Sequence, residues 1–414
     1  MLTKGAIGNL VNKYRAVLKK CRLLNLFGTL ALTGALTVGA AGMAGAAPVP
    51  APWDGETVTI GTSKTENVST LFDIVPDKDQ SGGKNVATTT LTIDGGALSL
   101  SNGARLVHYN YDGQSGVTTG MDVTMKSGSL TVDGSSAYTS MDVNTARIEG
   151  GTVELTGKAG AAWENAAYIG AYKGMDITGG TVNMQINSEL FAGNHFSITG
   201  GTINMQGTDT SGGFGNNAAH IMFTSENTIG GTAQINVVNG KYGVITTGPE
   251  LNITDGKINV AGNLLLQSDV TRGASLMYAG DETSTVNQTG GTVAVASTGA
   301  LNINKGVEYN LNGGTLSNAG TLHVEGELNL NNNMTLAELT AGTGKVYVGY
   351  DPDNSGNDRD GYAKIRLGTA ETLATSALGD KGDGKSITVD ANGSLQVQNL
   401  TLTGDSLSIN KEGR

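Results

Sequence analysis

The sequence predicts an all-β protein built as a parallel β-helix, a solenoid with Gly-Gly corners, an N-terminal cap and loop insertions. Three observations predict it: a recurring unit of two short alternating strands joined by a glycine pair, many glycines with few prolines, and few aromatic residues. A unit this small cannot bury its apolar side alone, so neighbouring units must stack on it. Clear copies of the unit begin at Leu91, Ala146, Met175, Phe196, Leu251 and Leu400.

The unit is typified by Met175-Asp-Ile-Thr-Gly-Gly-Thr-Val-Asn-Met184. Its alternation gives each strand one apolar and one polar face, and glycine supplies the positive backbone angles that a sharp corner needs. The second corner residues fall at 96, 128, 151, 180, 201, 231, 256, 291 and 314. Their spacings run from 21 to 35 residues, as expected for coils of about 21 residues that carry loops of variable length.

Two rival folds share the alternating pattern. An outer-membrane barrel needs strands of about ten residues and aromatic girdles, whereas the half-units here are nearer four residues and the chain has 2 Trp, 12 Tyr and 6 Phe. An antiparallel sandwich could use the glycine pairs as hairpin turns. Repetition of one motif over about 300 residues favours the parallel stack.

Residues 1–46 have the layout of a secretory signal peptide with an extended basic n-region. Six basic residues and no acid precede an apolar run over 23–42, and Ala44-Gly45-Ala46 matches a cleavage site. This order predicts export through the general secretion machinery. Cys21, the single cysteine, lies in this leader, so the body of the chain has no disulfide framework.

The remaining chain divides by changes in periodicity. Residues 47–90 are less regular and are expected to form the N-terminal cap, and 91–345 carry the β-helix repeats. Residues 346–367 are expected to form a hairpin around an acidic loop, with 345–350 paired to 362–367. Residues 368–414 resume the repeat and stop directly after a strand, which suggests a truncated stack.

The net charge of the chain indicates which classes of macromolecule it can bind. The net charge is −11, and the leader contributes +6, so the rest of the chain carries −17. An acidic body without basic clusters argues against nucleic acid as a partner.

The sequence predicts no catalytic, cofactor-binding or metal-binding residues, and hence no enzyme. The acidic loop 351–361 echoes the start of a calcium loop, but Tyr362 stands where such a loop needs a bidentate glutamate. A solvated turn is the favoured interpretation. The histidines His108, His195, His220 and His323 are scattered without ligand spacing. Asparagines near the corners and in the later coils are expected to stack as hydrogen-bonded ladders.

Taken together, the leader, the Gly-Gly-Thr coils and the cysteine-free acidic body resemble an autotransporter (type V secretion) passenger domain. The resemblance implies a surface-exposed or secreted bacterial protein that acts as an adhesin or structural stalk, at the cell surface, in the outer membrane or outside the cell. Its partners would be an outer-membrane translocator and a host or glycan ligand that the sequence does not identify. The chain shows no C-terminal translocator barrel, so the barrel would be a missing part or a separate protein. A secreted polysaccharide lyase or hydrolase and a fibre or spike subunit are the alternatives.

Overall fold

The structure is a computed structural model of the whole chain. It describes residues 57–62, 64–68, 71–73, 89–112, 116–160, 165–208, 217–268, 284–349, 363–368, 371–379, 385–389, 393–397 and 400–403. The predicted leader and the acidic loop 351–361 lie outside the described residues. None of the helices in the described ranges has the length and apolar composition of a membrane-spanning segment.

The described strands stack in three columns, which we call A, B and C. Column A contains β1 (Thr57–Gly61), β4 (Thr89–Asp94), the later parts of β7 (Gly116–Met125) and β9 (Thr139–Ile148), the middle of β11 (Ala167–Met184), the first part of β13 (Phe196–Met205), β15 (Glu226–Ile229), β18 (Glu250–Ile253), β21 (Ser284–Gln288), β24 (Val307–Leu311), β27 (Glu327–Leu330), β29 (Ala363–Leu367) and β33 (Gly393–Val397). Column B contains β2 (Thr65–Val68), β5 (Ala97–Ser101), β8 (Ser129–Asp133), β10 (Thr152–Thr156), the ends of β11 and β13, β16 (Gln234–Val237), β19 (Lys257–Val260), β22 (Thr292–Val295) and β25 (Thr315–Asn318).

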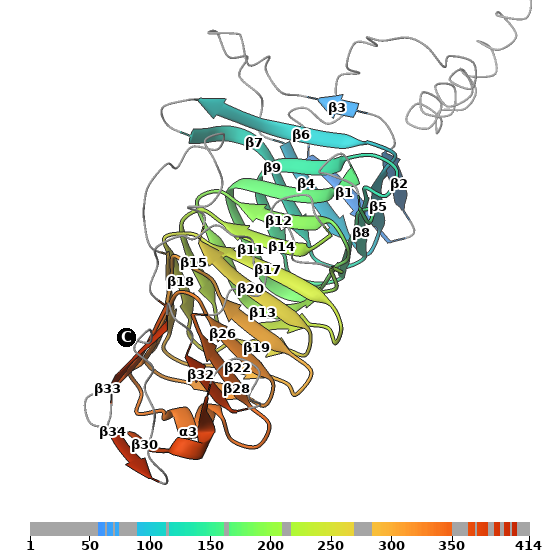
Figure 1. The fold of residues 1–414 in the computed structure, drawn as a ribbon. Coiled ribbons are helices and arrows are strands. Elements are labelled where there is room, and N and C mark those ends of the chain that lie inside the picture. The colour runs from blue at the N-terminus through green and yellow to red at the C-terminus, as the bar shows by residue number, and fades with distance from the viewer. Residues whose placement is uncertain are drawn as a thin grey trace, which may run out of the picture. The chain divides into compact units, whose positions relative to one another are not determined.

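Column C contains β3 (Leu71–Asp73), β6 (Arg105–Asp112), the first parts of β9 and β11, β12 (Ser188–Ala192), β14 (Ala219–Phe223), β17 (Tyr242–Thr247), β20 (Asn263–Ser268), β23 (Ala300–Ile303), β26 (Thr321–Val324), β28 (Lys345–Val348) and β32 (Ile387–Val389). The chain passes from A to B to C and then returns to A one coil further on. Every pairing within a column is parallel, which confirms the predicted parallel β-helix (Figure 1).

One strand pair of the described chain runs the other way. The end of β6 pairs antiparallel with the start of β7, joining Tyr109–Asp112 to Gly116–Gly120. These residues extend beyond the parallel pairings that the same two strands make in columns C and A. They form a hairpin added to the coil.

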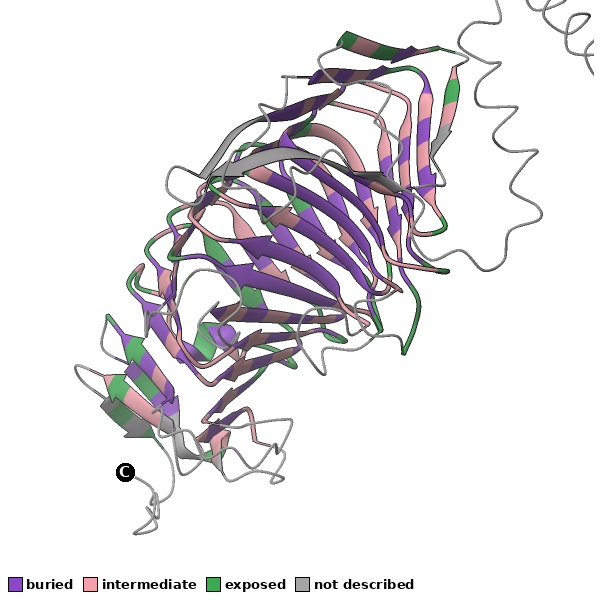
Figure 2. Ribbon diagram, turned by 90° about the horizontal axis from the view of Figure 1, so that it is seen from above, coloured by how far each residue is buried: buried purple, intermediate pink, exposed green. Residues whose placement is uncertain are grey.

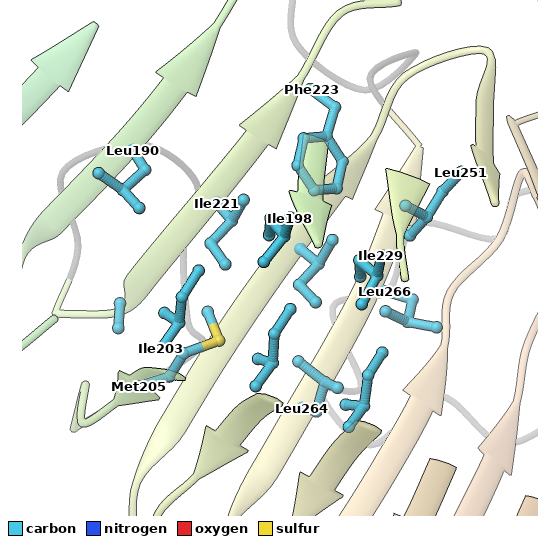
Figure 3. Packing of buried hydrophobic residues seen from close by; sticks show 14 of the residues in the cluster. Leu190, Ile198, Ile203, Met205, Ile221, Phe223, Ile229, Leu251, Leu264 and Leu266 are labelled. Atoms are coloured by element: carbon cyan, nitrogen blue, oxygen red, sulfur yellow. The ribbon is translucent and has the colours of Figure 1, made fainter. Parts of the chain in front are cut away.

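The core fills the space between the columns. In columns A and B the burial alternates residue by residue, as in β10 and β19 (Figure 2), so that every second side chain points inward. Phe196 and Phe223 meet edge to face across the interior with their centroids 4.9 Å apart. Figure 3 shows aliphatic side chains that successive strands contribute, among them Leu190, Ile198, Ile203, Ile221, Ile229, Leu251, Leu264 and Leu266.

A few polar residues break the apolar pattern inside, among them Gln288 and Asn318. Gln288 stands where an apolar residue is expected, and it is fully buried. Its Oε1 accepts a 2.6 Å hydrogen bond from the Tyr309 hydroxyl, and its Nε2 donates to the Thr315 carbonyl at 3.0 Å. Because both ends of the amide are bonded, its burial leaves no unsatisfied polar group.

The Gly-Gly corners lie between columns A and B. Gly291 has φ +64°, and a Cβ added there would overlap the carbonyl oxygen of Gly256 in the preceding coil. Glycine is therefore required both by the backbone angle and by the close approach of the neighbouring coil. The second corner glycine has positive φ at 128, 151, 180, 201, 231, 291 and 314, whereas in the first corner pair it is Gly95 that does.

The prediction of a hairpin over 346–367 is wrong. β28 has parallel partners on both edges, β26 and β32, and β29 has β27 and β33. A strand has only two hydrogen-bonding edges, so neither is free to pair with the other. The two strands belong to columns C and A of the helix itself.

The end regions also follow the coil pattern. In the interval 47–90, for which a cap is expected, β1, β2 and β3 already pair in parallel with β4, β5 and β6 as one coil. Beyond 368, β32 and β33 extend columns C and A. β30 (Glu371–Ala374) pairs in parallel with β34 (Leu400–Thr403) as a separate two-stranded sheet, and the 3₁₀ helix η4 (Thr375–Ala377) and β31 (Leu378–Gly379) follow β30.

A short helix takes the column B position in one coil. Helix α3 (Leu336–Leu339) follows β27, precedes β28 and contacts both β25 and β30. Thr335 and Glu338 form a capping box at its start. The buried carboxylate of Glu371 accepts a further hydrogen bond from the Leu336 amide at 2.9 Å, so the next coil also holds the helix.

We expect Gly291→Ala to destabilise the protein more than Gly240→Ala. Gly240 has nearly the same angle, φ +66°, but nothing lies within 4 Å of an added Cβ, whereas at Gly291 the Cβ meets backbone. The left-handed angle costs about 1–2 kcal/mol in each variant, and the overlap at Gly291 adds about 1–3 kcal/mol. Urea unfolding followed by circular dichroism measures both. Equal losses in the two variants would contradict the role of the close approach.

Candidate functional site

The outward side of column C buries several polar side chains in successive coils of the described structure. Strands β9, β12, β14 and β17 bury residues of both parities, whereas columns A and B alternate (Figure 2). The odd-numbered Met141 and Ile169 and the even-numbered Leu190 belong to the core cluster. Their sequence neighbours therefore point away from it.

Two outward rows result from the register of column C. We call the first the upper row; its members are Arg105, Ser140, Tyr168, Glu189, His220 and Val244. We call the second the lower row; its members are Asp142, Gly170, Phe191, Met222, Thr246 and Gln267. The strands that carry them lie side by side in Figure 1.

A chain of hydrogen bonds crosses four successive coils between the two rows. Glu189 Oε2 lies 3.0 Å from His220 Nδ1, and His220 Nε2 lies 2.7 Å from the Thr246 hydroxyl. The Gln267 amide donates to that same hydroxyl oxygen at 2.8 Å. Glu189 and His220 are each 5% exposed and Thr246 is 1% exposed. We call this the Glu189–Gln267 chain.

One assignment of protons satisfies every group in the Glu189–Gln267 chain. The Glu189 carboxylate accepts only, so His220 carries its proton on Nδ1 and donates it there. The neutral imidazole then accepts at Nε2 from the Thr246 hydroxyl. The Thr246 oxygen accepts from Gln267, and the hydroxyl is polarised by the imidazole. A carboxylate, an imidazole and a hydroxyl in this order are the elements of an activated nucleophile.

A second polar group surrounds Asp142, which is 5% exposed. The Ser140 hydroxyl donates to Asp142 Oδ2 at 2.6 Å, and the Tyr172 hydroxyl lies 3.3 Å from Oδ1. The carboxylate is thus bonded through both oxygens on the outward side of the sheet, which offsets the cost of burying its charge.

Aromatic rings pack around these polar groups. Tyr168 lies 6.3 Å from Tyr138 and 6.3 Å from Phe191, and Phe191 lies 5.3 Å from Tyr172 between centroids. The Arg105 guanidinium lies 5.5 Å from the centre of the Tyr138 ring. Burial, and then repulsion by Asp142, raises the pKa of Tyr138, and burial raises the pKa of Tyr168 well above its ordinary value. Both phenols therefore stay protonated at neutral pH.

Another histidine lies further along column C. His323 pairs in register with Tyr347, and their rings stack with centroids 5.2 Å apart and planes at 15°. Burial lowers the pKa of His323 to about 4, because the charged imidazolium is disfavoured away from water. His323 is therefore neutral at pH 7.

The predicted asparagine ladders are present on the outward side of columns A and B. In column B, Asn183, Asn204, Asn236 and Asn259 each donate to the residue one coil before, at 2.5 to 2.9 Å, and the first of them donates to Glu154. In column A, a second ladder runs from Glu250 through Asn287, Asn310 and Asn329. Each ladder begins at a glutamate, which is the stronger acceptor.

The sequence analysis did not single out the members of the Glu189–Gln267 chain. Its members are 31, 26 and 21 residues apart, so they show no short spacing, yet each step is one coil. The available signal was the loss of alternation, as in Ala-His-Ile-Met-Phe over β14, where neither face is consistently polar. Of the other histidines, His195 lies 3.3 Å from Asp176, with more than half of its side chain exposed.

Neither a search for metal-binding groups nor a comparison with known proteins adds residues to this site. Within the described ranges, no group of three or more His, Cys, Asp or Glu side chains is placed to hold a metal ion. The predicted acidic turn at 351–361 lies outside those ranges. Comparison with known proteins found no matching family model, curated protein or solved structure.

We expect His323 to make stability depend on pH between about 4 and 6.5. In that range the unfolded chain binds a proton that the folded protein excludes, so the free energy of unfolding falls as pH falls, by up to about 3 kcal/mol for this shift. His323→Phe keeps a ring against Tyr347 and removes the titration. Urea unfolding at pH 7 and pH 4.5 should show a smaller pH difference in the variant, and an unchanged difference would contradict this origin.

Proposed function

We propose that this chain is an exported β-helical passenger displayed on a bacterial surface, where it acts as a stalk or adhesin. The observation that carries the proposal is the unbroken parallel pairing of column A from β1 to β33. Each coil is held mainly by its neighbours. A chain that crosses a membrane unfolded can therefore fold coil by coil as it emerges.

The composition supports export of such a chain. The leader carries the basic, apolar and small-residue order of a signal peptide. The body contains no cysteine, so no disulfide can form before the chain has crossed an oxidising compartment. Its net charge of −17 favours solubility outside the cell. The autotransporter passenger family combines these features, and we propose membership in it on this basis.

The outward faces of columns A and B support a display role. Their rows are rich in threonine and asparagine, and the two amide ladders fix many of these side chains. In column B these rows present regularly spaced donors and acceptors with few charges, and in column A they also carry glutamates such as Glu250, Glu308 and Glu327. A stalk needs this kind of stable, soluble face, and an adhesin can place its ligand contacts on loops above it.

The enzyme alternative finds less support. A glycoside hydrolase needs two carboxylates that reach the substrate. Asp142 and Glu189 are the buried carboxylates of the outward rows, and each is already bonded, to Ser140 and to His220. A panel of polysaccharides incubated with the purified protein should therefore show no cleavage, and turnover would favour the alternative. A stable trimer in sedimentation would favour a fibre subunit.

We expect Ala46→Phe to block removal of the leader, whereas in Gly45→Phe the leader is still removed. The two outer positions of an A-x-A site must be small, and the middle position tolerates a large side chain. In cells that make the protein, the mature form should begin at Ala47 by mass spectrometry. Antibody should label it on intact cells, and added protease should reach it. A processed protein that stays shielded in intact cells would contradict surface display.

A further inference from the structure

The Thr246 hydroxyl lies between a base and an electrophile. On one side, His220 Nε2 is 2.7 Å away, with Glu189 behind it at 3.0 Å from Nδ1. On the other side, the Gln267 carboxamide is in contact, with its nitrogen 2.8 Å from the hydroxyl oxygen. The carbonyl carbon of that amide is bonded directly to this nitrogen. The arrangement therefore holds an activated hydroxyl beside an acyl group of the same chain, and a turn of the carboxamide brings its carbon toward the hydroxyl oxygen.

We propose that Thr246 and Gln267 react to form an ester bond that joins β17 to β20 covalently. The substrate is thus the protein itself, and the activity is a single self-acylation. It is separate from the proposed display function.

The reaction balances without a co-reactant. His220 Nε2 takes the hydroxyl proton while Thr246 Oγ1 attacks the side-chain carbonyl carbon of Gln267, and the carbonyl oxygen becomes an oxyanion. The imidazolium then gives its proton to the amide nitrogen, the carbon–nitrogen bond breaks, and ammonia leaves. The products are one ester and one ammonia molecule, with no change in oxidation state. His220 returns to its neutral form.

The fold supplies the positioning that the reaction needs. Thr246 and Gln267 are direct register partners in adjacent parallel strands, so their side chains stay next to each other and only the carboxamide has to turn for the reaction. Groups held in this way react as if at very high concentration. His220 is held two coils from Gln267 by its own pairing with Glu189 across β12 and β14.

Burial protects the ester from hydrolysis, so the acyl group stays on the threonine. Thr246 is 1% exposed and His220 is 5% exposed, so water has little access to the ester once it forms. Most enzymes with a carboxylate, an imidazole and a hydroxyl need an open site for an outside substrate. Here the acyl donor, the half-buried Gln267, belongs to the chain itself, and the burial of Thr246 and His220 shields the product from water.

The roles of the four residues follow from the contacts. Thr246 is the nucleophile, Gln267 is the acyl donor and His220 is the general base and acid. Glu189 touches only the imidazole, so it is a positioning residue that fixes the tautomer. The cross-link would supply, in a cysteine-free body, the covalent tie between coils that a disulfide cannot.

Mass spectrometry of the purified full-length protein tests the proposal. We expect an intact mass lower than that of the sequence, after leader removal, by one ammonia molecule. Trypsin cleaves after Lys241, Lys257 and Arg272, so the denatured digest should contain peptides 242–257 and 258–272 joined as one species. Hydroxylamine, which cleaves esters, should separate them. Two separate peptides and an unreduced intact mass in the folded wild-type protein would overturn the proposal.

Variants locate the bond. Thr246→Val should restore the full mass and separate the peptides, whereas Thr246→Ser and the neighbouring control Thr247→Val should keep the cross-link. His220→Gln should lower the rate of cross-linking by about 10²–10⁴-fold. Loss of the joined peptide in Thr247→Val together with its retention in Thr246→Val would overturn the assignment. The wild-type measurement decides the proposal even where a variant fails to fold.

The positioning role of Glu189 has its own readout. Glu189→Gln should lower the fraction of joined peptide below that of the wild-type protein. Glu189→Asp, which keeps a carboxylate, should give a fraction between the two. A purely structural role would make this fraction follow thermal stability instead. Equal cross-linking in the two variants would contradict the positioning role.

Discussion

The fold depends on the hydrogen bonds that join one corner to the next along the stack. The Thr292 amide donates to the Gly256 carbonyl at 3.0 Å, and the Thr315 amide donates to the Gly291 carbonyl at 3.0 Å. The Gly256 oxygen is the same atom that a Cβ at position 291 would overlap. The corner must therefore lack a side chain so that its neighbour can bond there. Coil spacing is set by this contact, at about 4.8 Å.

Once the corners fix the spacing, the register decides which side chains meet. Residues in equivalent places lie directly above one another, so like residues form ladders and unlike residues form specific contacts. Asn236 meets Asn204 and Asn259 in this way, and His220 meets Glu189. The same stacking rule thus produces a uniform polar face in column B and the Glu189–Gln267 chain of hydrogen bonds in column C.

The sequence predicted what is local and missed what depends on register. The glycine pairs and the alternation predicted the parallel coils and the aliphatic core, because both patterns lie within one unit, and the asparagine ladders followed from the stacking of like units. Strands β28 and β29 were wrongly paired as a hairpin because closeness in sequence says little in a solenoid, where partners are a coil apart. The capping box of Thr335 and Glu338 at the start of α3 is also a local pattern, but the sequence analysis did not use it. The loss of alternation in β14 marks the region of the Glu189–Gln267 chain, but its members could not be paired from the sequence, since the variable loops between coils conceal the register.

The two kinds of outward face suggest a division of roles within one stack. The outward side chains of columns A and B are joined by amide ladders and, in column A, by ion pairs such as Lys364–Glu327, so these faces are stable in contact with water. The outward side of column C instead buries Glu189, His220 and Thr246, which costs free energy unless every group is bonded. A stack can form without such a chain, as the remaining coils show. Its presence in adjacent coils therefore points to a task that stacking alone does not require, and joining those coils is the task its geometry fits.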